Sequence, residues 1–124
     1  MACLRAASGA WLRRQFRLTR SQDFQRVRRS GQSYAHPLLV LAVLANDATA
    51  VHVGVAAGRT VGTAVRRNRA KRLLRAAMQG LIQAIAPGWD LVLIARPALV
   101  TSDYFEVRQA LIGLLRRAQL VEPA

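Results

Sequence analysis

Apolar and polar positions follow one another along the chain in patterns that predict helices separated by strands. A helix with a narrow apolar stripe should follow Thr19, because Thr19 and Gln22 have the spacing of a capping box, and it should end near Gly31. Leu and Val dominate residues 34–45, which predicts a largely buried strand. Residues 51–55 alternate in character, which predicts a half-buried strand antiparallel to the previous one.

The second half of the chain predicts two helices around one strand. Over residues 63–86 the apolar side chains gather on one side of a helical wheel, and Pro87 ends the pattern. The apolar run 89–95 is typical of a central strand. A last helix should be capped by Ser102 or Asp103. The predicted fold is α+β in the order α-β-β-α-β-α, a two-layer sandwich with helices covering a small mixed sheet.

The charge of the chain is large and unevenly placed. Its 124 residues include 19 Lys and Arg against 6 Asp and Glu, a net charge of +13. Residues 1–75 hold 15 basic and 2 acidic side chains, whereas residues 76–124 hold 4 of each. Such an excess indicates a polyanionic partner, with nucleic acid the first candidate and an anionic membrane surface the second. Its concentration in the first 75 residues indicates a binding surface.

Few side chains offer the chemistry of a catalyst. Cys3 is the only cysteine, which excludes an intrachain disulfide and a cysteine zinc site. His36 and His52 lack metal-ligand spacing, and only Asp103 and Glu106 are acids close in sequence, where they fit the first turn of a helix. We therefore expect neither catalytic residues nor a metal site in the protein itself.

The remaining composition concerns domain organisation and location. No apolar run approaches the roughly 20 residues that span a bilayer, so we expect no membrane insertion. The lone cysteine is compatible with a reducing cytosol, and we expect a cytoplasmic protein. Residues 1–15 are predicted to form a basic, flexible extension, and residues 16–122 to fold as one domain.

The most informative segment is the basic stretch 66–75 within the predicted long helix. Asn68, Lys71, Arg72 and Arg75 recur at i, i+3, i+4 and i+7, and therefore share one face of the helix. Like charges on one face repel each other, so binding to a polyanion would explain the arrangement. The start of the helix adds free N–H groups and a positive dipole end, which also suit phosphate.

This segment resembles the bacterial ribonuclease P protein family. The family carries an Arg-Asn-x-x-Lys-Arg-x-x-Arg helix preceded by a Gly-x-Ala-Val step, and residues 62–65 and 67–75 match both at every signature position. The resemblance covers about residues 16–120, in which Asp23-Phe24 looks like part of the family's first helix and residues 89–96 like its last strand.

The resemblance implies the protein subunit of a ribonucleoprotein endonuclease that removes the 5′ leader of precursor tRNA, with one protein bound per catalytic RNA. It further implies that the RNA subunit binds most of the catalytic Mg²⁺, and that a left-handed β-α-β crossover surrounds the basic helix. The residues expected to contact the catalytic RNA are Arg59, Arg66, Arg67, Asn68, Arg69, Lys71, Arg72 and Arg75. Those expected in a leader-binding cleft between the first helix and the sheet are Arg17, Arg20, Phe24, Arg28 and Tyr34.

Alternatives remain at the level of sequence. A ribosomal or general RNA-binding protein could use the same basic helix, and a peripheral membrane protein could use its apolar side. Phe24 also lies on the apolar stripe of its helix, so a role in the core competes with leader stacking. Arg28 stands where family members often carry a second aromatic residue, and Gly58-Arg59-Thr60 where they usually carry Ser-Lys-Lys. These departures bear on leader preference more than on RNA binding.

Overall fold

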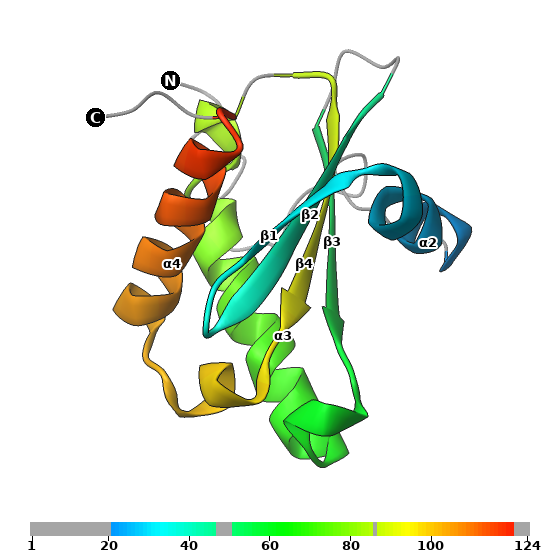
Figure 1. Ribbon diagram of the computed structural model, residues 1–124. Coiled ribbons are helices and arrows are strands. Elements are labelled where there is room, and N and C mark those ends of the chain that lie inside the picture. Colours follow the sequence, from blue (N-terminus) through cyan, green and yellow to red (C-terminus); the bar gives the residue numbers. More distant parts are fainter. Residues whose placement is uncertain (1–20, 47–50, 86, 121–124) are drawn as a thin grey trace.

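The order of helices and strands follows from a computed structural model that describes residues 21–46, 51–85 and 87–120 (Figure 1). The predicted extension 1–15 and the capping residue Thr19 lie outside these residues. The helices and strands are α2 (Ser21–Ser30), β1 (Gln32–Ala35), β2 (Leu39–Ala45), β3 (Val51–Ala57), α3 (Ala64–Gln79), β4 (Trp89–Ala95) and α4 (Tyr104–Arg117). In this part of the chain they are joined by the 3-10 turns η2 (Arg59–Val61), η3 (Ile82–Ala84) and η4 (Pro97–Thr101).

The described residues form a sheet of four strands in the order β1-β2-β4-β3. β2 pairs antiparallel with both β1 and β4, whereas β3 and β4 are parallel and are joined through α3. The predicted antiparallel pairing of β3 with the preceding strand is therefore wrong, because β4 lies between the two. The β3-α3-β4 connection is the crossover for which the resemblance implies a left hand.

The apolar stretch 34–45 forms two strands, where the pattern predicted one. β1 ends at Ala35 and β2 begins at Leu39, and the two pair as a hairpin. Pro37 lies in the connection. Its missing N–H cannot take part in strand pairing, which disfavours one continuous strand across this position. The turn is closed by the N–H of His36, which donates to the carbonyl of Leu39 at 2.9 Å.

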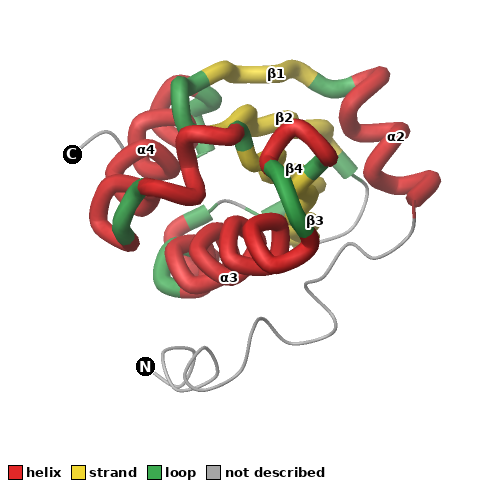
Figure 2. Tube along the Cα trace, turned by 90° about the horizontal axis from the view of Figure 1, so that it is seen from below, coloured by secondary structure: helices red, strands yellow, loops and turns green. Residues whose placement is uncertain are grey.

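Helices cover both faces of the sheet. α3 and α4 lie side by side on one face, and α2 crosses the other (Figures 1 and 2). The main core lies under α3 and α4 and includes Leu41, Leu74, Met78, Leu93 and Leu111. A smaller core of Val27, Ala42 and Val92 lies under α2, flanked by Phe24, Leu44 and Ile94. The predicted α+β fold with helices on a mixed sheet is confirmed, and α2 adds a layer opposite the other two helices.

The ends of the helices show where local signals succeed. The hydroxyl of Thr63 accepts from the N–H of Arg66 at 3.3 Å and caps α3. Asp103 caps α4 through a full capping box with Glu106, as predicted. α3 ends at Gln79 and not near residue 86, because Gly80 interrupts it and the chain continues as the 3-10 turn η3.

Candidate nucleic-acid interface

The basic face of α3, defined as Asn68, Lys71, Arg72 and Arg75, points away from the buried side of the helix. Ala70, Leu74, Ala77 and Met78 are fully buried against the sheet and α4. Asn68 and Arg72 are exposed, whereas Lys71 and Arg75 are half-buried along the flank. The predicted separation of apolar and basic sides is therefore confirmed for Asn68 and Arg72, whereas Lys71 and Arg75 border the buried side.

Arg66 and Arg69, two of the residues predicted to contact RNA, also make hydrogen bonds within the protein. The Nε–H of Arg66 donates to the carbonyl of Val61 in η2 at 3.3 Å. The Nε–H of Arg69 donates to the carbonyl of Val100 in η4 at 3.1 Å. Both residues are nevertheless exposed. Each side chain is therefore fixed at its Nε–H while the residue still faces solvent. They join the start of α3 to the two short turns beside it.

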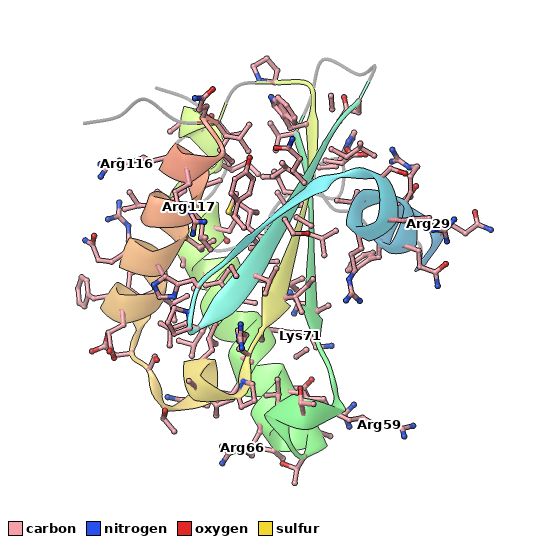
Figure 3. The ribbon with its side chains drawn as sticks, in the orientation of Figure 1. Arg29, Arg59, Arg66, Lys71, Arg116 and Arg117 are labelled. Carbon is pink, nitrogen blue, oxygen red and sulfur yellow. The ribbon has the colours of Figure 1, made fainter. Side chains whose placement is uncertain are left out.

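The edge of the sheet next to the start of α3 carries more positive charge. Arg59 follows β3 and Arg96 follows β4, and both are exposed. Because parallel strands have their carboxyl ends at one edge, and Ala57 pairs with Ala95, these arginines leave the sheet at the same edge. Figure 3 shows Arg59 and Arg66 at this end of the molecule. Arg96 was not predicted as a contact, since only the strand pairing places it here.

On the other face of the sheet, Phe24 packs directly on β3. A Cβ built at Gly54 would lie 2.5 Å from Cζ of the Phe24 ring and 2.8 Å from Cε1. Gly54 is buried, whereas Phe24 is half-buried and Val27, one turn later, is fully buried. The absence of a side chain at Gly54 therefore gives the ring its place.

Beside Phe24 the same face carries a row of small and apolar side chains. The strand register aligns Ala35, Val40, Ile94 and Ala56 across all four strands. Each lies two residues along its strand from the positions that α2 covers, such as Ala42 and Val92, and so faces the same way. Val40, Ile94 and Ala56 are half-buried and Ala35 is exposed. We call these four residues the apolar row.

The other residues predicted for the leader cleft have different outcomes. Arg28 is exposed on α2, on the expected side of the sheet. Arg17 and Arg20 lie outside the described residues. The prediction that Tyr34 lies between α2 and the sheet is wrong. Tyr34 pairs with Leu41 of the main core and so points toward α4 and away from α2. There the guanidinium carbon of Arg117 lies 5.7 Å from the centre of the Tyr34 ring.

A buried polar cluster around Asp90 was not foreseen from the sequence. Its carboxylate accepts from Nη2 of Arg26 at 2.6 Å and from Nδ2 of Asn46 at 2.7 Å, and lies 3.0 Å from Nδ1 of His52. Burial alone would raise the pKa of Asp90, but the hydrogen bonds from these three side chains hold that pKa below its usual value. The same contact with Asp90 raises the pKa of Arg26.

Within residues 21–46, 51–85 and 87–120, no three His, Cys, Asp or Glu side chains gather as metal donors. The carboxylate of Asp90 is already engaged by its three neighbours. The described residues therefore show no donor cluster that would hold a Mg²⁺ ion without further ligands from RNA. No helix in the described part of the chain is both long enough and apolar enough to cross a bilayer.

The chain is similar to known proteins in both sequence and fold. A family model described as Ribonuclease P matches residues 12–119. The ribonuclease P protein component of Herpetosiphon aurantiacus is 41% identical over 109 residues, covering 88% of this chain and 89% of the relative. That of Clostridium botulinum is 37% identical over 103 residues, covering 82% of this chain and 93% of the relative.

Solved structures show the same fold. The RNase P protein from Staphylococcus aureus matches with a TM-score of 0.77 and 25% identity, covering 86% of this chain and 98% of that one. The RNase P protein from Thermotoga maritima matches with a TM-score of 0.73 and 30% identity, with the same coverage of each chain. The chain resembles these proteins in sequence and in fold over most of its length, and it therefore belongs to the ribonuclease P protein family.

Proposed function

We propose that this protein component of ribonuclease P binds the catalytic RNA through the basic face of α3 and the adjoining sheet edge. The observation that carries the proposal is the exposure of Asn68 and Arg72 on the side of α3 turned away from the core, flanked by further arginines. Arg59 and Arg66 extend this positive surface past the start of the helix (Figure 3). Guanidinium groups suit phosphate because their planar fork can donate two parallel hydrogen bonds.

The leader of precursor tRNA is assigned to the opposite face, on the apolar row beside Phe24. Single-stranded nucleotides bind proteins by stacking on aromatic side chains while cations follow the backbone. The half-buried Phe24 ring borders the apolar row, and Arg28 lies on the same helix. Supporting this assignment, the two surfaces lie on different sides of the sheet, so one protein can contact catalytic RNA and substrate together (Figure 1).

The protein's contribution to cleavage is positioning and charge. Arginines neutralise phosphates of the two RNAs, which lowers their mutual repulsion, and contacts with the leader hold the substrate in register. We assign the catalytic Mg²⁺ mainly to the RNA subunit, since the described side chains offer no fitting donor set. One protein per catalytic RNA and a cytoplasmic location complete the proposal.

Reconstitution tests it. With the ribonuclease P RNA, low Mg²⁺ and precursor tRNA, cleavage at the 5′ leader should require both RNA and protein. The protein alone should cleave nothing. Cleavage by the protein alone, or no stimulation of the RNA, would contradict the proposal. Preferential tight binding to ribosomal RNA or to duplex DNA would favour a general nucleic-acid-binding protein in its place.

A further inference from the structure

We propose that Asp90 is a positioning residue for leader binding, because it holds α2 through Arg26 and so places Phe24 beside the apolar row. The inference rests on the proposed leader site. Asp90 lies on β4, an inner strand that pairs with both β2 and β3. Its side chain does not reach the leader surface, since the residue is only 3% exposed. Any influence on the leader therefore acts through α2.

The contacts of Asp90 join three other parts of the chain. Arg26 comes from α2, Asn46 follows β2, and His52 belongs to β3. The contact with Arg26 is the shortest of the three, at 2.6 Å, and it is an ion pair between one buried and one half-exposed partner. The carboxylate thus links the helix directly to the centre of the sheet.

α2 depends on such an anchor because little of it is buried. Its apolar contacts come from Val27, which is fully buried, and from Phe24, which is half-buried. The helix also carries Arg28 and Arg29 beside Arg26, and these like charges repel one another and the rest of a basic protein. Asp90 supplies a fixed negative partner on the sheet side of the helix.

Arg26 and Phe24 contact neighbouring rows of paired residues on the same face of the sheet. Asp90 pairs with His52, and two residues along the same strands Val92 pairs with Gly54. Arg26 binds at the first row, and Phe24 packs on Gly54 at the second. Without the ion pair at the first row, α2 is free to turn or shift about the second, which changes where the Phe24 ring lies relative to the apolar row.

Charge and position predict opposite results for Asp90→Asn, which makes the test sharp. The substitution adds one unit of positive charge, so simple electrostatics predicts tighter binding of every RNA. Loss of the anchor predicts weaker binding of leader-bearing substrate only. Asp23→Asn is the matched control, because it adds the same charge and removes a 3.7 Å ion pair with Arg26 that lies within α2.

The experiment measures the Kd of precursor tRNA and of mature tRNA for the reconstituted holoenzyme. Asp90→Asn should reduce the preference for the leader-bearing substrate by roughly twofold to thirtyfold, the range for residues that act on a site through another residue. Asp23→Asn should leave that preference unchanged. Equal preference in wild type and Asp90→Asn would overturn the proposal, as would an equal loss in both variants.

A second pair of variants covers the case in which Asp90→Asn does not fold. Arg26→Gln removes the partner at a side chain that is 45% exposed, and Arg29→Gln removes the same charge from an exposed position of the same helix. Only Arg26→Gln should lower the leader preference. It should also speed hydrogen exchange of α2 amides, relative to those of α4, in the free protein. Unchanged exchange and unchanged preference would overturn the anchor.

Phe24→Ala separates this inference from the proposed leader site. If Phe24→Ala lowers the leader preference and neither Asp90→Asn nor Arg26→Gln does, the leader site stands and the positioning role of Asp90 is wrong. If Phe24→Ala has no effect on that preference, the leader site itself is wrong, and the role assigned to Asp90 falls with it.

Discussion

The ring of Phe24 lies over Gly54, so close that a single methyl group at Gly54 would overlap it at 2.5 Å. A helix on one side of the sheet and the edge strand β3 are thereby fitted to each other at one point. The atoms in conflict belong to the tip of a side chain and not to backbone, so the ring can give way by rotating out. The proposed leader site therefore depends on the missing side chain at Gly54 as well as on the aromatic ring.

Gly54→Ala should displace the Phe24 ring while the fold is kept. We expect a loss of about 1–3 kcal/mol in the free energy of unfolding from overpacking, together with weaker preference for leader-bearing substrate. Chemical denaturation and substrate binding measure the two effects. Gly113→Ala is the control, because a Cβ there meets no atom within 4 Å and α4 should gain about 0.5–1 kcal/mol. An intact leader preference in Gly54→Ala would separate the ring from the leader.

Phe24→Ala should weaken binding of precursor tRNA more than that of mature tRNA, because the ring borders the apolar row. The half-buried position predicts a stability loss below the about 3–5 kcal/mol of a fully buried phenylalanine. Kd values for both substrates with the holoenzyme check this. Tyr34→Ala, a half-buried aromatic on the opposite face, should leave the leader preference unchanged. Equal losses on both substrates in Phe24→Ala would indicate a role in the core alone.

Arg72→Ala should weaken binding of the catalytic RNA with little loss of stability, because the side chain is exposed on the outer side of α3. The slope of log affinity against log salt should become shallower by about 0.7–0.9 for each phosphate that the protein no longer neutralises. Titrations at several salt concentrations measure that slope. Arg116→Ala, exposed on α4, is the control and should change it less. An unchanged slope in Arg72→Ala would show that Arg72 does not bind phosphate.

The lowered pKa of Asp90 predicts a loss of stability in acid. The folded state binds fewer protons than the unfolded state between about pH 4, the ordinary carboxyl value, and the lower folded pKa, so stability falls as pH drops through this window. Asp90→Asn should cost about 1–3 kcal/mol at pH 7, less than a fully buried pair because Arg26 is half-exposed. The difference between the two proteins in the free energy of unfolding should shrink as the pH falls through this window. A constant gap at all pH values would contradict the ion pair.

Local patterns predicted the elements of this fold better than their pairing. Residues close together in sequence determine the apolar side of α3, the run forming β4 and the cap of α4 at Asp103. The hairpin expected between β2 and β3 failed because β4, more than thirty residues further along the chain, pairs with both. The alternation of apolar and polar residues within a strand does not show whether that strand pairs with a nearby or a distant strand.

The same limit applies to the candidate sites. The basic face of α3 could be predicted because helical spacing fixes which residues share a face. The sequence predicts the wrong side of the sheet for Tyr34, because its strand is separate from β2. Only the register of the hairpin shows that Tyr34 points toward α4. No local pattern indicates the cluster around Asp90, because its partners Arg26, Asn46 and His52 lie 38 to 64 residues away in sequence.

The hydrogen bonds from Arg66 and Arg69 to backbone carbonyls order part of the proposed RNA interface in the free protein. A free arginine carries about 2 kcal/mol of rotamer entropy, part of which is lost when a ligand orders it. Here folding orders the two stems first, through a single Nε–H each, before any RNA is bound. Lysine would keep the charge but has no Nε–H to hold its stem in this way. In the proposed RNA interface, part of the binding affinity is thus set when the free protein folds, because these two side chains are partly ordered before RNA binds.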